Sequence, residues 1–230
     1  MKETLKRLGL FIILFLVFLY KDLVYLIPLS ILKIKFDSLN YNIQTLLSVL
    51  SSCILAGIII IIYRKVLKEK FTDYKKNFNL YFETGMKCWF IGLITMSVSN
   101  ILISNFSPVH EANNEALVQE MLKQAPFLVF ISASFLAPFL EEMLFRKSFG
   151  DIFKNKKVMV LASGLLFGLL HVVFSVKTPW DYLYVIPYGA LGAAFAYSLY
   201  KTDNIFVPIT FHTIHNGVLT LLSIILSVIK

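Results

Sequence analysis

The sequence predicts an all-α protein, a polytopic integral membrane bundle of about seven (six to eight) transmembrane helices. Hydrophobic residues make up 57% of its 230 residues. The mean hydropathy of +0.74 is higher than a soluble domain of this length requires. Charged residues amount to only 16% and cluster between long apolar runs. Several runs reach the roughly 20 residues that cross a bilayer.

Seven apolar runs define the predicted spans. In chain order they are Leu8–Leu26, Gln44–Tyr63, Cys88–Ser104, Phe127–Phe145, Val158–Phe174, Tyr182–Tyr200 and Ile205–Ser227. Lys21 and Asp22 weaken the end of the first run, and Pro28–Phe36 is a further partial span or an interfacial segment. No small-x-small cleavage site follows the first run, so we interpret it as an uncleaved span rather than a signal peptide.

The segments between the spans predict the orientation. With a cytoplasmic N-terminus, most of the 22 lysines and arginines face the cytoplasm. We therefore expect a protein of the cell membrane with its N-terminus inside. The basic segment Arg64–Lys76 is predicted to be a solvated cytoplasmic loop, and Asn105–Ala125 an outer loop with an amphipathic helix over 112–123. The net charge of +8 then reflects contact with anionic lipid and no nucleic-acid partner.

Two adjacent carboxylates, Glu141 and Glu142, interrupt the fourth span. Ionisable groups inside a membrane helix are costly, so they indicate function. On a helix, Glu142 lies beside Arg146 four residues later, whereas Glu141 is turned about 100° away. The spacing predicts a supporting Glu142–Arg146 pair and leaves Glu141 free to act as a general base. A charge cluster at the helix end is the structural alternative.

Three more polar groups interrupt the later spans. His171 lies on a helix that also carries Gly164 and Gly168, which permit close approach of another helix. His212 and Asn216 lie one turn apart, so an imidazole and an amide form a two-donor clamp suited to an oxyanion. Packing and hydrogen bonding between helices are the structural alternatives for these residues.

One geometric condition follows for a single site. Glu141 is near the end of its span and His171 is far from the start of the next. They meet only if the fourth helix continues past Arg146 towards Gly150, or if the two helices are offset. We expect that continuation, and a polar cavity reached from the cytoplasmic side.

Metal and nucleophile motifs are weak in this chain. Two histidines and a glutamate can bind catalytic zinc, but no His-Glu-x-x-His occurs and the donors come from three helices, so zinc stays open. No Gly-x-Ser-x-Gly is present. Cys53 and Cys88 lie in or next to apolar runs without a Cys-x-x-Cys pattern, which predicts packing residues and no disulfide.

The order of these motifs resembles a known family. It runs Glu141-Glu142-Met-Leu-Phe-Arg146, then Phe167-Gly-Leu-Leu-His171, then Pro208-Ile-Thr-Phe-His212-Thr-Ile-His-Asn216. This order is similar to that of the CAAX protease and bacteriocin-processing (CPBP, or Abi) family of intramembrane proteases. The resemblance covers roughly residues 125–223. It implies a CPBP-like catalytic core over residues 126–227. The membrane helices of residues 1–125 carry no family signature, and both parts are expected to form a single membrane domain.

The resemblance implies a glutamate-dependent endopeptidase that needs no metal or other cofactor. Glu141 with His171 would activate water, His212 and Asn216 would stabilise the oxyanion, and Glu142 with Arg146 would support them. The substrate would be a membrane-associated peptide or protein, through CAAX-type processing, peptide or bacteriocin maturation, or self-immunity.

Two alternatives from other classes stay open. Buried acids and histidines also mark proton-coupled transporters, although the chain shows no repeated halves. A catalytically inactive immunity or scaffold protein is the other alternative, although the motif residues are all present. The sequence carries no prediction of the oligomeric state.

Overall fold

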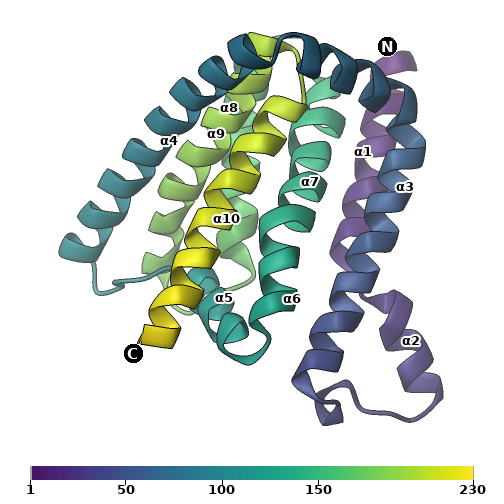
Figure 1. The fold of residues 1–230 in the computed structure, drawn as a ribbon, viewed down its shortest axis with the longest axis vertical. Helices are drawn as coiled ribbons and strands as arrows, with labels where there is room; N and C mark the ends of the chain where they lie inside the picture. Colours follow the sequence, from purple (N-terminus) through teal and green to yellow (C-terminus); the bar gives the residue numbers. More distant parts are fainter. Residues whose placement is uncertain (1, 230) are drawn as a thin grey trace.

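The chain folds as an all-helical membrane bundle. The computed structural model describes residues 2–229, and every regular element within them is a helix. Six helices are long and apolar enough to cross a membrane, or seven if the bent pair at the start forms one span. Figure 1 shows the N-terminus at one end of the bundle and the C-terminus at the other. The fold class predicted from the sequence is confirmed.

The elements follow one another with short connections. They are α1 (Lys2–Tyr20), α2 (Leu23–Ile31), η1 (Phe36–Ser38), α3 (Tyr41–Lys76), α4 (Phe78–Phe106), α5 (Asn113–Gln124), α6 (Pro126–Ile131), η2 (Ser132–Leu136), α7 (Ala137–Glu142), η3 (Met143–Ser148), η4 (Gly150–Ile152), α8 (Lys156–Val173), η5 (Pro179–Tyr184), α9 (Val185–Thr202) and α10 (Phe206–Ile229). Segments η2 and η3 are π-helical, and the other three η segments are 3-10 turns.

The first predicted span is broken. It was expected to run to about Leu26, with its end weakened by Lys21 and Asp22. In the structure α1 ends at Tyr20 and α2 leaves at 48° to it, so the break lies at that charged pair. Asp22 lies at the break, where it accepts a 2.6 Å hydrogen bond from Ser51 of α3. Lys21 forms a 2.9 Å ion pair with the same carboxylate. The charged pair is thus anchored where the chain bends away.

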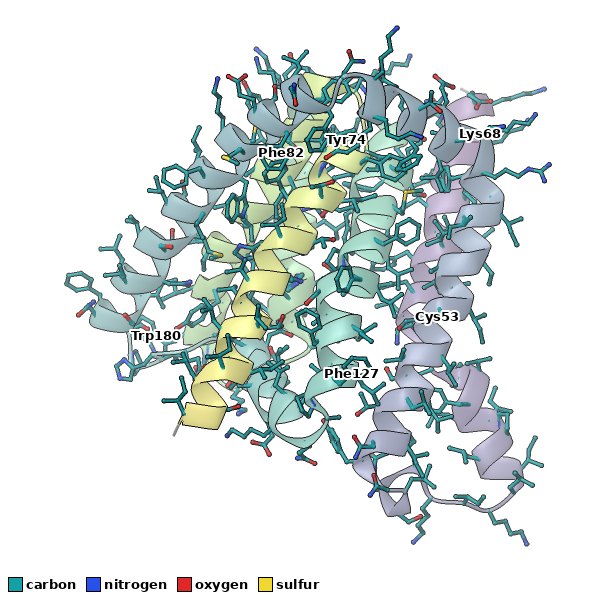
Figure 2. All side chains as sticks on the ribbon, viewed as in Figure 1. Cys53, Lys68, Tyr74, Phe82, Phe127 and Trp180 are labelled. Atoms are coloured by element: carbon teal, nitrogen blue, oxygen red, sulfur yellow. The ribbon has the colours of Figure 1, made fainter. Side chains whose placement is uncertain are left out.

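Helix α3 is longer than its apolar run. The predicted span Gln44–Tyr63 lies inside it, but the expected loop Arg64–Lys76 is helical as well, so that loop prediction is wrong. The segment is rich in lysine, a good helix former, and contains no Gly or Pro, so nothing ends the helix at the membrane. At 36 residues α3 is about 54 Å long, well beyond a hydrocarbon core of about 30 Å. Its basic end, marked by Lys68 and Tyr74 in Figure 2, crosses the end of the bundle, where the hydroxyl of the buried Tyr74 lies 3.0 Å from that of Thr210 in α10.

The fourth predicted span forms one helix with two wide turns. It runs over Pro126–Ile152 through α6, η2, α7, η3 and η4. The predicted continuation beyond Arg146 to Gly150 is confirmed. Pro138, in the first turn of α7, has no N–H and its ring would clash with the carbonyl four residues earlier. The preceding π turn widens the helix there, and π segments are frequent at functional sites.

The later elements agree with the prediction. Helix α5 covers the expected amphipathic segment, and α8, α9 and α10 cover the last three runs. Helices α8 and α9 pack closely, since a Cβ atom at Gly168 would lie 2.5 Å from the carbonyl oxygen of Val185. One at Gly164 would lie 2.8 Å from that of Gly189. The predicted close approach at Gly164 and Gly168 is therefore confirmed, and it sets the position of His171 further along α8.

Polar groups concentrate inside the bundle and large apolar groups outside. The buried polar side chains include Glu142, Arg146, Ser134 and Asn204, whereas many leucines, isoleucines and phenylalanines are exposed. This inverts the soluble pattern and is expected where the surroundings are lipid. Both cysteines are free. In Figure 2 Lys68 and Trp180 lie towards opposite ends of the bundle, which separates a lysine-rich end from the end that carries α5.

Candidate active site

The two adjacent glutamates of α7 occupy different environments. The Glu142 side chain is completely buried, whereas 15% of the Glu141 side chain is exposed. Consecutive residues on a helix point about 100° apart, so one carboxylate faces the packed interior and the other faces open space. The predicted division of the pair is present in the structure.

Glu142 pairs with Arg146 on the next turn. Oε2 of Glu142 lies 3.1 Å from Nε of Arg146, and both side chains are fully buried. Nη2 of Arg146 donates a 3.0 Å hydrogen bond to the carbonyl oxygen of Gly192 on α9. The guanidinium lies over the Phe167 ring, 4.4 Å from its centre. A buried charge needs such partners, so Arg146 ties α7 to α8 and α9.

His171 of α8 faces Glu141. Its Nε2 lies 4.0 Å from Oε2 of Glu141, which satisfies the condition for a single site. Its Nδ1 lies 2.9 Å from the carbonyl oxygen of Phe167, and a carbonyl only accepts, so Nδ1 carries a proton. The imidazole stacks between Phe167 and Tyr188, with ring centres 4.2 and 4.8 Å away. The aromatic neighbours and the backbone bond hold Nε2 towards Glu141.

His212 of α10 lies between the two glutamates. Its Nδ1 donates a 2.8 Å hydrogen bond to Oε1 of Glu142, and its Nε2 is 3.8 Å from Oε2 of Glu141. The ring stacks on Phe195 at 4.7 Å. The sequence did not predict the bond to Glu142, because helical spacing reveals partners only within one helix. The fold therefore gives Glu142 two partners, Arg146 and His212.

Asn216 is placed near the site but is already bonded. Its Nδ2 donates a 2.9 Å hydrogen bond to the carbonyl oxygen of Ala133, which lies in the π turn η2. Asn216 lines the same cavity as His171 and His212. One of its two amide hydrogens therefore holds α10 against η2, and the other has no protein acceptor among residues 2–229.

Two cavities meet at His171. The first, the axial cavity, has a volume of about 410 Å³ and runs from His212 to α5 and the loop before it, where Glu115 and Glu111 line it. The second, the lateral cavity, has about 430 Å³ and lies beside α1. Its lining residues are Phe18, Leu19, Tyr20, Lys21, Asp22, Asn114, Glu141, Phe145, Leu170, His171 and Phe174. The axial cavity extends away from the lysine-rich end. The lysine-rich end is the expected cytoplasmic side. Because that orientation is itself a prediction, access from the cytoplasm stays a prediction.

A zinc site built from two histidines and a glutamate, which the sequence left open, would have to use Glu141, His171 and His212. Oε2 of Glu141 lies 4.0 Å from Nε2 of His171 and 3.8 Å from Nε2 of His212. Among residues 2–229, no group of three His, Cys, Asp or Glu side chains has an arrangement suited to a metal ion. Nδ1 of each histidine is hydrogen-bonded within the protein, that of His212 to Glu142 and that of His171 to Phe167, whereas Nε2 of each ring faces Glu141.

Comparison with known proteins now adds to this geometry. Residues 123–218 match the family model described as type II CAAX prenyl endopeptidase Rce1-like, and this stretch contains all six predicted site residues. The UPF0177 protein YajF of Lactococcus lactis is 32% identical over 149 residues, which cover 63% of this chain and 71% of the relative. The chain belongs to the Rce1-like family. The family resemblance drawn from the three motifs is thereby confirmed.

Other relatives of this Rce1-like chain are also membrane proteins or uncharacterised proteins by name. YdiL of Bacillus subtilis, provisionally named a membrane peptidase, is 27% identical over 185 residues, covering 78% of this chain and 72% of the relative. The UPF0177 protein YaiH of Lactococcus lactis is 27% identical over 172 residues, which cover 74% of this chain and 71% of the relative. No solved structure matches the Rce1-like chain.

Proposed function

We propose that this Rce1-like chain is an intramembrane endopeptidase that hydrolyses a peptide bond of a membrane-associated peptide or protein. The observation that carries the proposal is the position of Glu141. Its carboxylate lies 4.0 Å from Nε2 of His171 and 3.8 Å from Nε2 of His212, at the wall of a cavity in an apolar bundle. The family match supports a protease, and it does not favour a transporter or an inactive membrane protein.

The proposed base is Glu141 acting with His171. Since Nδ1 of His171 holds its proton on the Phe167 carbonyl, the neutral ring has a lone pair on Nε2. Two acceptors 4.0 Å apart are too distant to bond directly, and Oε2 of Glu141 is enclosed and without a hydrogen-bond partner among the described residues. We propose that a water molecule enters with the substrate and donates to both. Glu141 takes a proton from that water while the water oxygen bonds to the scissile carbonyl carbon. The proton passes to the leaving amine as the peptide C–N bond breaks.

The proposed oxyanion donors are His212 and Asn216. With Nδ1 of His212 donating to Glu142, a second proton on Nε2 makes an imidazolium that the two carboxylates stabilise. Its Nε2–H then points towards the charge that develops on the carbonyl oxygen. Two carboxylates, Arg146 and a protonated His212 sum to zero charge, which suits an apolar interior. Asn216 would supply the amide hydrogen that Ala133 does not take.

The decisive experiment compares matched carboxylate variants in cells. Glu141→Gln and His171→Ala are expected to insert normally and to abolish the peptide products that wild-type protein releases from the membrane proteome. Glu83→Gln, a carboxylate exposed on α4, is the control and is expected to leave those products unchanged. The proposal fails if both site variants preserve every product of the wild-type protein.

A second measurement tests the metal-independent mechanism. We expect the purified protein to keep its activity in EDTA and in 1,10-phenanthroline, because carboxylate and imidazole activate the water. Loss of activity in either chelator, with recovery on adding zinc, would replace the proposed mechanism by a zinc-dependent one.

A further inference from the structure

His215 is a polar residue in the site that neither the motif nor the proposed mechanism uses. It lies on α10 three residues after His212 and is 95% buried, with an exposed fraction of 5%. It nevertheless lines the axial cavity together with His171, His212 and Asn216. A buried imidazole at the wall of a reaction cavity requires an explanation of where its two ring nitrogens point.

One ring nitrogen of His215 is held by Trp89 of α4. The indole Nε1 of Trp89 lies 3.3 Å from Nδ1 of His215, and the two rings meet edge to face at 79°. An indole N–H can only donate, so Nδ1 must accept with its lone pair. The imidazole is therefore neutral, and its one proton is on Nε2. Trp89 thus selects the tautomer of His215.

The other ring nitrogen of His215 is an unused donor. Within the part of the chain that the structure describes, Nε2 has no hydrogen-bond partner, and it is not among the fully enclosed polar atoms that lack one. Because Nδ1 is turned to Trp89, Nε2 is the nitrogen that reaches the cavity. The neighbouring Asn216, by contrast, already gives one hydrogen to Ala133.

We propose that Nε2–H of His215 binds a backbone carbonyl of the peptide substrate, next to the scissile bond on the axial-cavity side. This inference rests on the proposed endopeptidase function. His215 lies about 4.5 Å from His212 along the helix axis and about 60° around it, so it addresses a neighbouring carbonyl. Carbonyls on one edge of an extended peptide recur every two residues, about 6.6 Å apart, so the carbonyl that His215 binds would be the next one on the same edge as the scissile carbonyl. A neutral donor suits an amide carbonyl, so the site recognises extended backbone rather than a particular side chain.

The proposal gives α4 a function in a segment without family signature. Trp89 acts as a positioning residue, since it does not touch the substrate but keeps the proton of His215 on the cavity side. Without the indole N–H, the His215 proton could move from Nε2 to Nδ1, and Nε2 would then present a lone pair to the cavity. Two acceptors, the substrate carbonyl and Nε2, would then oppose each other.

The test uses the full-length protein in detergent and a quenched fluorescent peptide. The peptide is selected from a random-sequence library because wild-type protein cleaves it and Glu141→Gln does not. His215→Phe keeps the ring shape and removes the donor. Removing a hydrogen bond that exists equally in ground and transition state should raise KM about 5- to 10-fold with kcat changed less than about 2-fold. His215→Gln keeps an amide hydrogen near Nε2 and should restore KM to within about 2-fold of wild type.

A second readout examines Trp89 directly. Nitrogen-15 NMR of histidine-labelled protein should show His215 protonated at Nε2, and Trp89→Phe should move it towards a mixture of tautomers. Trp89→Phe should also raise KM without lowering kcat. The inference is overturned if His215→Phe leaves KM unchanged, if Gln is no better than Phe, or if kcat falls while KM is unchanged. If wild-type protein cleaves no peptide in a Glu141-dependent manner, the proposed function fails, and this inference fails with it.

Discussion

Glu142 accepts a 2.8 Å hydrogen bond from Nδ1 of His212, although 70 positions separate the two residues in the chain. The Glu142 side chain is completely buried, and its other oxygen faces Arg146. The Glu142 carboxylate therefore contacts both the buried guanidinium of Arg146 and the imidazole of His212, which faces the cavity. Substitution of Glu142 should therefore lower both stability and activity, whereas substitution of Glu141 should lower activity alone.

Glu142→Gln should damage both stability and activity. It removes the negative charge beside Arg146, and an unpaired buried charge typically costs about 3–5 kcal/mol. Thermal unfolding in detergent measures that loss, and Glu141→Gln, at the carboxylate that forms no ion pair with Arg146, should unfold close to wild type. The double variant Glu142→Gln/Arg146→Met should regain much of the stability without regaining peptide cleavage. Wild-type stability in Glu142→Gln would contradict the assigned role of the ion pair.

The close approach of α8 and α9 should tolerate no side chain at Gly168. A Cβ atom there would lie 2.5 Å from the Val185 carbonyl oxygen and 2.8 Å from the Gly189 nitrogen. Gly168→Ala should therefore destabilise the protein by about 1–3 kcal/mol. It should also lower activity, because His171 lies three residues further along α8. Gly57→Ala, where nothing lies within 4 Å, is the control, expected to be neutral or stabilising by up to about 1 kcal/mol.

A buried amide should hold the lysine-rich end of the bundle together. Nδ2 of Asn204, before α10, donates 2.8 Å hydrogen bonds to the carbonyl oxygen of Lys70 and to Oδ2 of Asp73. Asn204→Ala removes both bonds, leaving Oδ2 of Asp73 only the bond from the Tyr81 hydroxyl, and should cost about 1–3 kcal/mol in thermal unfolding. Lys70→Met removes only the pair with the exposed Asp203 and should cost less than about 1 kcal/mol. Equal losses of stability in Asn204→Ala and Lys70→Met would contradict the proposed role of the Asn204 amide in holding this end of the bundle together.

The orientation can be tested by labelling single cysteines in intact cells. In the Cys53→Ser/Cys88→Ser background, Asn114→Cys lies where both cavities approach α5, and Lys68→Cys lies on the basic end of α3. With a cytoplasmic N-terminus, an impermeant maleimide should label only Asn114→Cys until the cells are broken. The reverse pattern would contradict the orientation predicted from the lysine distribution and would place the axial cavity on the cytoplasmic side.

Local spacing predicted what lies within one helix. The apolar runs predicted the spans, and the four-residue interval between Glu142 and Arg146 predicted their pair, because helix geometry is the same in every fold. The same reasoning failed for the ends of helices. Arg64–Lys76 was expected to be a loop, but its polarity determines only that it leaves the lipid, whereas its helix-forming residues keep it helical.

The membrane class, the polar residues available for chemistry and the unequal environments of the two glutamates could all be predicted from the order of residues. Which polar groups meet could not, because their partners lie on other helices. The bonds from His212 to Glu142, from Asn216 to Ala133 and from Trp89 to His215 join residues 70, 83 and 126 positions apart. Such pairs depend on how helices pack, and packing arises from many small contacts at once, such as the glycine crossing of α8 and α9, rather than from the spacing of any one motif.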